Sequence, residues 1–141
     1  MDFMYDHHCF VCGEDNPIGL KLKFVQDGEQ VKTTFVPTKN FEGYPGILHG
    51  GIISTILDEL MSQCVQCLGL AGLTARLEIR YRHSVPIGKP VEFSAKILKR
   101  KGPLVDLEAK AVLADGEVAA EASGRFMISK QSNQQKEDAR C

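Results

Sequence analysis

The segment 49–68 constrains the fold of this chain more than any other part of it. A glycine-rich turn, Pro45 to Gly51, runs directly into a stretch in which apolar residues recur every three or four positions. That spacing places them on one broad stripe of an α-helix, and the stripe comprises Ile53, Ile56, Leu57, Leu60, Met61, Cys64 and Leu68. The sequence therefore predicts one long helix from about His49 to Leu68 that packs along this stripe.

The opposite face of this helix carries small and polar residues, namely Gly51, Ser54, Thr55, Asp58 and Ser62. No Lys or Arg occurs between Asn40 and Ala75, although the chain contains 17 of these residues. A helix face in contact with water usually carries long charged side chains. Their absence predicts that this face is covered, most simply by a second copy of the chain.

Most of the remaining chain alternates between apolar and polar residues, which is the pattern of half-buried β-strands. The clearest example is 73–82, directly after the helix. Further strands are expected over 20–24, 31–35, 91–97, 105–113 and 118–128. This order of two strands, one helix and four strands predicts an α+β domain built on an antiparallel sheet.

We expect this domain to span residues 20–129. An N-terminal segment, 1–19, precedes it and contains the motif Cys9-Phe-Val-Cys12. The last residues, 130–141, are rich in Gln, Ser, Asn and Lys and predict a disordered tail.

Charge and composition exclude several classes of partner. The chain has 141 residues, 43% of them hydrophobic, and a net charge of −1, which gives no general attraction to nucleic acid or to a membrane surface. No apolar run approaches the ~20 residues that span a bilayer, and the N-terminus lacks the basic and then apolar order of a signal peptide. A cytoplasmic protein is expected.

The turn and the helix together carry groups that can act on a carbonyl. Backbone N–H groups at the helix start, unobstructed at Gly50 and Gly51, can donate to a developing oxyanion. Asp58 follows nine residues after His49, about two and a half helical turns further in.

The run from Pro45 to Gly51, followed by Asp58 and by the strand 73–82, resembles the signature of the hotdog-fold acyl-CoA thioesterases. Within the 4-hydroxybenzoyl-CoA thioesterase superfamily, it is most similar to the branch with the phenylacetate-pathway enzyme and the thioesterase-superfamily members. The resemblance implies a curved antiparallel sheet wrapped around one central helix. It also implies a homodimer or homotetramer with active sites at the subunit interface, and hydrolysis of an acyl-CoA or aryl-CoA to the free acid and CoA without a cofactor.

The resemblance implies a role for each matching residue. The Gly50 N–H would polarise the thioester oxygen, and Asp58, contributed across the interface, would activate water or attack the carbonyl. Thr74, sixteen residues after Asp58, would orient the water. His49 and Gly51 would line the bound thioester, with His49 ordering the turn through a hydrogen bond.

Coenzyme A carries phosphates, and the chain offers two groups of cations for them. Lys99, Arg100 and Lys101 form its densest positive cluster, at a predicted hairpin tip. Arg80 and Arg82 lie on the polar side of the strand that follows the helix.

Two alternatives remain open at this stage. One is a hotdog module that binds acyl-CoA without cleaving it. The other is a zinc or redox protein based on Cys9, Cys12, Cys64 and Cys67. The two C-x-x-C pairs are too far apart in sequence for a standard zinc motif, so we predict no metal ligand. Glu59 is adjacent to Asp58 but points about 100° away around the helix, and we treat it as structural. The acyl group is not predicted.

Overall fold

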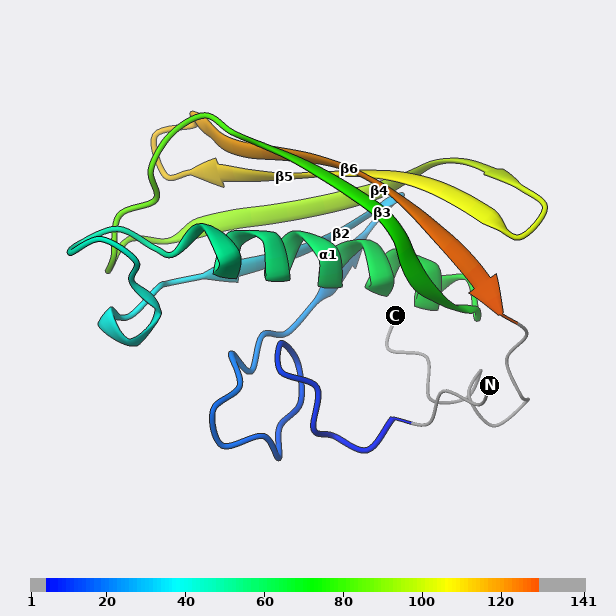
Figure 1. Ribbon diagram of the computed structural model, residues 1–141, viewed down its shortest axis with the longest axis horizontal. Helices are drawn as coiled ribbons and strands as arrows, with labels where there is room; N and C mark the ends of the chain where they lie inside the picture. Colours follow the sequence, from blue (N-terminus) through cyan, green and yellow to red (C-terminus); the bar gives the residue numbers. More distant parts are fainter. Residues whose placement is uncertain (1–4, 130–141) are drawn as a thin grey trace.

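A single long helix lies along one face of a six-stranded antiparallel sheet within residues 5–129, the part of the chain that this computed structural model describes (Figure 1). The strands are β1 (Val25–Asp27), β2 (Gln30–Phe35), β3 (Ala71–Tyr81), β4 (Val91–Lys101), β5 (Leu104–Leu113) and β6 (Val118–Ser129). Their order across the sheet is β1-β2-β4-β5-β6-β3, so the long strand β3 forms an edge. The predicted α+β class is confirmed, and β3 and β6 curve over the helix (Figure 1).

The helix α1 (Gly50–Cys67) matches the prediction to within a residue at each end. The helix is followed by Gly69, whose φ of 74° is one that glycine adopts without strain and whose N–H donates to the Gln66 carbonyl at 2.8 Å. The predicted apolar stripe is buried except for Leu68, which lies past the last helical residue and is 51% exposed.

The core lies between α1 and the concave side of the sheet. Ile56 and Leu60 of the helix and Phe93, Leu107 and Phe126 of the strands are all fully buried there. Burial of these large side chains stabilises the packing of α1 against the sheet. It also fixes which face of α1 points away from the sheet.

The predicted strand over 20–24 is wrong. Leu20 and Leu22 donate their N–H groups to the Phe10 and Val11 carbonyls at 2.8 and 2.9 Å, so this segment bonds to the N-terminal segment. Lys21 has φ of 54°, which breaks an extended strand. The first strand is consequently only three residues long, Val25–Asp27.

The N-terminal segment packs on the side of α1 that faces away from the sheet (Figure 1). Val11 and Cys12 are buried in it. A short 3₁₀ helix, η1 (Lys39–Phe41), lies between β2 and α1. The expected tail, 130–141, lies outside the described residues. Within the described chain, no helix combines the length and the apolar character needed to cross a bilayer.

Candidate active site

The start of α1 presents one available backbone N–H. His49 is the N-cap, and its ring Nδ1 accepts a hydrogen bond from the Gly51 N–H at 2.8 Å. The Gly51 N–H is thereby occupied and is not available to a substrate. The Gly50 N–H has no acceptor within residues 5–129. Because the positive end of the helix dipole lies here, Gly50 offers the donor for a partly negative oxygen.

Tyr81, which the sequence analysis did not single out, completes this turn. It is the last residue of β3, and its hydroxyl donates to the Gly50 carbonyl at 3.0 Å. Its ring also lies 3.6 Å from the position that a Cβ on Gly50 would occupy. The end of β3 therefore supports the backbone that carries the available N–H.

Asp58 and Thr74 meet between the middle of α1 and the start of β3. The Thr74 hydroxyl donates to Asp58 Oδ1 at 2.5 Å. Asp58 is partly buried and Thr74 is exposed, so a ligand from solvent can reach both. The structure therefore brings together two of the three residues predicted to be catalytic.

A β-bulge turns Thr74 toward the helix. Strict alternation along β3 would place Thr74 on the same side as Arg76, away from α1. The pairing register with β6 shifts between Thr74 and Arg76, so Thr74 lies opposite the buried Phe126 and Arg76 lies opposite Arg125. The extra residue is Ala75. Bulges commonly re-aim a side chain beside a functional site.

The third predicted catalytic group, Gly50, lies far from this pair in the same chain. Eight residues of α-helix separate Gly50 from Asp58, a rise of roughly 12 Å. One thioester carbonyl cannot contact both groups of a single chain.

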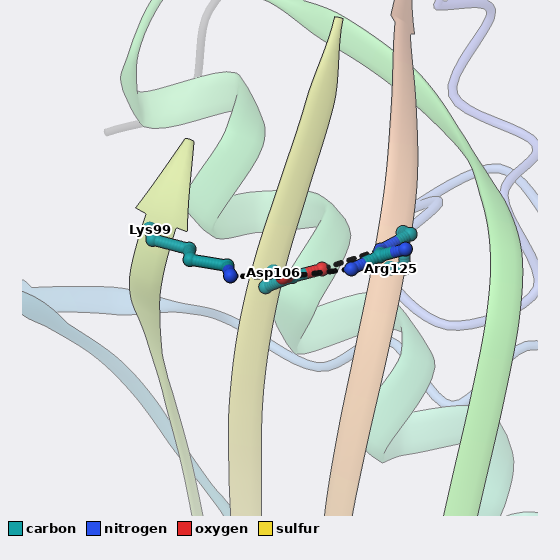
Figure 2. Close-up of polar contacts among 3 residues, drawn as sticks. All are labelled: Lys99, Asp106 and Arg125. Carbon is teal, nitrogen blue, oxygen red and sulfur yellow. Dashed lines mark hydrogen bonds and ion pairs between the residues drawn. The ribbon is translucent and has the colours of Figure 1, made fainter. Parts of the chain in front are cut away.

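The predicted phosphate ligands differ in how far their charges are already neutralised. Lys99, Arg100 and Lys101 are exposed at the end of β4. Lys99 Nζ lies 3.8 Å from Asp106 Oδ2, and the same carboxylate accepts hydrogen bonds of 2.7 and 3.1 Å from Arg125 (Figure 2). These bonds from Arg125 hold the pKa of Asp106 below its usual value. Arg100 and Lys101 take part in no ion pair among the described residues.

The arginines of β3 are placed differently. Arg82 binds Glu121 Oε2 through Nε and a terminal nitrogen at 3.1 and 2.9 Å. Arg80 lines a groove of about 460 Å³ on the sheet, together with Lys96 and Lys110. Arg80 lies six residues beyond Thr74 along the strand, roughly 20 Å away.

A second polar cluster surrounds Glu59, the residue after Asp58. The thiols of Cys9 and Cys12 donate to Glu59 Oε1 at 3.7 and 3.4 Å, and Gln63 Nε2 donates to the same oxygen at 3.1 Å. Burial raises the pKa of Glu59 to about 7. The hydrogen bond from Cys12 lowers the pKa of Cys9 to about 5, and the same bond raises the pKa of Cys12.

Sequence reasoning missed the role of Glu59 in this cluster. The Cys9-x-x-Cys12 motif was visible, but its third member lies 47 residues further along the chain. The sequence also suggested a second pair, Cys64 and Cys67. Neither of these cysteines belongs to the group that Cys9, Cys12 and Glu59 form.

Comparison with known proteins identifies the family. The profile of the thioesterase superfamily matches residues 45–120, which include the start of α1, Asp58 and Thr74. This chain belongs to the thioesterase superfamily. The predicted family is thus confirmed.

Curated relatives within this superfamily match most of the chain. Acyl-coenzyme A thioesterase THEM4 of Bos taurus is 26% identical over 121 residues, covering 84% of this chain and 50% of that protein. Acyl-coenzyme A thioesterase THEM5 of Mus musculus is 28% identical over 105 residues, covering 72% of this chain and 42% of that protein. The chain spans about half the length of the curated relatives it matches.

Solved structures of the superfamily share the fold. A crystal structure of a thioesterase superfamily protein superposes with a TM-score of 0.81 at 27% identity, covering 86% of this chain and 63% of that one. A hypothetical thioesterase of Streptococcus pneumoniae TIGR4, crystallised with coenzyme A, has a TM-score of 0.75 at 18% identity, covering 79% and 91%. These likenesses confirm the hotdog fold.

Proposed function

We propose that this chain is an acyl-CoA thioesterase, which hydrolyses an acyl-CoA or aryl-CoA to the free acid and CoA. The observation that carries the proposal is the hydrogen bond from Thr74 to Asp58 on a helix face without Lys or Arg. A carboxylate held by a hydroxyl, reachable from solvent, is suited to act on water or on a carbonyl carbon. The sequence similarity to acyl-coenzyme A thioesterases supports the same activity.

The two side chains divide the task in a simple way. The Thr74 hydroxyl donates its proton to Asp58, so its oxygen lone pairs are free to accept from a water. A water bound there lies beside the carboxylate that removes its proton. Direct attack by Asp58 on the thioester, followed by hydrolysis of an anhydride, is the other mechanism that this geometry allows.

The developing oxyanion requires a donor that one chain does not place near Asp58. We assign this role to the Gly50 N–H of the partner subunit, because Gly50 and Asp58 of one chain are roughly 12 Å apart. The edge strand β3 has eleven residues and exposes Leu73 at 54%, which favours pairing with a second copy. The active unit is then a homodimer or a larger even assembly.

Two properties of the Streptococcus pneumoniae thioesterase support a CoA thioester as substrate and the roles proposed for Asp58 and Thr74. It was crystallised with coenzyme A. It was also crystallised as an Asp to Ala variant and as a Thr to Ala variant, at positions sixteen residues apart. Asp58 and Thr74 have the same separation in this chain.

We assign binding of the CoA phosphates to the cations at the end of β4, Lys99, Arg100 and Lys101. Arg100 and Lys101 are the stronger candidates among them. Their charges are not neutralised by ion pairs among the described residues, whereas Lys99 shares Asp106 with Arg125. Arg82 is held by Glu121 and is the weaker candidate.

One experiment separates the enzyme from the alternative, a module that binds acyl-CoA without cleaving it. Release of free thiol is measured for a panel of short aliphatic, long aliphatic and aromatic acyl-CoAs, with binding of each measured by calorimetry. We expect multiple turnovers on at least one class. Binding of one or more classes with no thiol release from any class would refute the hydrolase.

The assembly is tested separately. Analytical ultracentrifugation at micromolar concentration is expected to show a dimer or tetramer and no folded monomer. A stable and active species at the mass of one chain, 15.6 kDa, would refute the interfacial site.

A further inference from the structure

Cys9, Cys12 and Glu59 form a compact group of metal-ligand atoms outside the Asp58 site. Their two sulfurs and one carboxylate oxygen all lie within 4.8 Å of one another. Among residues 5–129, these three side chains form such a group of potential metal ligands. The cluster joins the N-terminal segment to α1 at the residue next to Asp58.

The spacing of these atoms matches the edges of a tetrahedral zinc site. Zinc bonds of ≈2.3 Å to sulfur and ≈2.0 Å to oxygen, at the tetrahedral angle, separate the two ligand atoms by about 3.5 Å. Glu59 Oε1 lies 3.4 Å from Cys12 Sγ and 3.7 Å from Cys9 Sγ. A single cation placed between these atoms can therefore contact all three.

The loop that carries the cysteines is already folded to present both sulfurs. The Val11 N–H donates to Cys9 Sγ at 3.4 Å, an interaction that stabilises a thiolate. The Gly13 N–H donates to the Cys9 carbonyl at 2.8 Å. A Cβ at Gly13 would lie 2.5 Å from the Cys9 nitrogen, so only glycine fits this close turn.

The environment of the cluster favours a cation. Cys12 is 4% exposed, and its thiol donates to the Glu59 carboxylate. No Lys, Arg or His of the described chain forms an ion pair with Glu59. Two thiolates and a carboxylate at this spacing repel one another unless a cation lies between them. Gln63, one turn further along α1, orients the carboxylate from outside the ligand set.

We propose that Cys9, Cys12 and Glu59 bind one Zn²⁺, with water in the fourth position. Two thiolates and one carboxylate favour zinc over magnesium and calcium, which prefer oxygen ligands alone. The site fastens the N-terminal segment to the helix that carries Asp58. It does not depend on the proposed hydrolase activity, because Glu59 points about 100° around that helix from Asp58 and its partner cysteines belong to the N-terminal segment.

The test uses the full chain, reduced under nitrogen, stripped with a chelator and titrated first with Co²⁺ and then with Zn²⁺. We expect one Co²⁺ per chain with a thiolate-to-cobalt charge-transfer absorption, displaced by one Zn²⁺. Cys9→Ser and Cys12→Ser should each weaken zinc binding at least tenfold and reduce that absorption. Glu59→Gln should keep the absorption but weaken binding. Cys64→Ala, which removes a buried cysteine from the same helix outside the cluster, should match the parent.

Two results would overturn the proposal. One is a reduced parent protein that shows no thiolate-to-cobalt absorption, whether or not Cys9 and Cys12 form a disulfide when the protein is oxidised. The other is zinc affinity in Cys9→Ser equal to that of the parent. If Cys12→Ser fails to fold by circular dichroism, the cobalt spectrum of the parent and the affinity of Glu59→Gln still decide.

Discussion

Asp58 and Glu59 are adjacent carboxylates on one helix, yet their surroundings differ in almost every respect. Asp58 is partly open to solvent and accepts a hydrogen bond from Thr74 of β3. Glu59 points about 100° around the helix. It accepts from two thiols and an amide that the N-terminal segment and α1 supply.

The comparison shows that the neighbouring element, more than the residue type, determines what a carboxylate can do. The edge strand leaves Asp58 accessible to a substrate. The N-terminal segment covers Glu59, and this burial raises its pKa to about 7. We therefore expect substitutions at the two positions to affect different properties. Substitution of Asp58 should remove activity, whereas substitution of Glu59 should change stability or metal binding.

The largest effect is expected for Asp58→Asn. It removes the carboxylate charge but keeps the shape, so thiol release should fall by roughly two to four orders of magnitude. The free energy of unfolding, measured with urea, should change little. Ser62→Ala, one turn further on the same face, is the matched control and should keep near-parental turnover. An Asp58→Asn protein within tenfold of the parent on every substrate would remove Asp58 from the mechanism.

The next largest effect is expected for Thr74→Val. This change keeps the branched shape and deletes the donor to Asp58, so kcat should fall roughly ten- to a hundredfold, the scale of one hydrogen bond to a charged group. Thr74→Ser should restore most of the activity. Thr34→Val, at an exposed threonine of β2, is the control for threonine loss in a strand. Equal activity in Thr74→Val and Thr34→Val would show that the bulge has only a structural role.

A third prediction concerns pH and Glu59 in metal-free protein. The pKa of Glu59 is about 7 in the fold and 4.5 in the reference state, so the folded protein holds its proton more tightly. The contribution of this group to stability is complete below pH 4.5, declines as pH rises and is lost above pH 7. The total is on the order of 3 kcal/mol.

Glu59→Gln tests this contribution, because the amide keeps an acceptor oxygen without the charge. With a chelator present, the variant should be more stable than the parent at pH 8, and its stability should vary less between pH 4.5 and 8. Urea unfolding across this range provides the measurement. The burial assigned to Glu59 would be contradicted if the free energy of unfolding of the parent, relative to that of the variant, increased as pH rises.

The sequence predicted α1 and most strands because their periodicity is local information. The spacing of apolar residues along the chain directly predicts a helix or a strand and the face of it that is buried. Asp58 and Thr74 were predicted through the family resemblance. That Thr74 faces the helix depends on the bulge at Ala75, which alternation alone cannot show, because an extra residue reverses the face of every position before it.

Features that depend on distant contacts were not predictable from periodicity. Lys21 breaks an apparent strand because its segment bonds to the N-terminal segment instead. The role of Glu59 requires the fold to bring Cys9 and Cys12 against α1. Likewise, Lys99 forms an ion pair with Asp106 of β5, and Arg82 forms one with Glu121 of β6. Which residues face each other in such pairs depends on the strand register of the whole sheet.

The smallest predicted effect concerns substrate binding by the hairpin of β4 and β5. If Lys99, Arg100 and Lys101 contact the CoA phosphates, they act far from the thioester and stabilise substrate and transition state equally. Replacing all three by Ala should raise KM for acyl-CoA by roughly three- to tenfold and leave kcat near the parental value, as expected for lost uniform binding. The salt dependence of KM should also weaken.

Two comparisons distinguish phosphate binding from a general effect of charge or folding. A second triple variant, with Ala at the exposed residues Lys23, Lys39 and Lys89, changes the net charge equally and should leave KM unchanged. Acyl thioesters of a short neutral thiol should be hydrolysed alike by the parent and by the hairpin variant, because they carry no phosphate. Equal losses on charged and neutral thioesters would instead indicate a structural role for the hairpin. Since Lys99 shares Asp106 with Arg125, Lys99→Ala alone should account for less of the increase in KM than Arg100→Ala or Lys101→Ala.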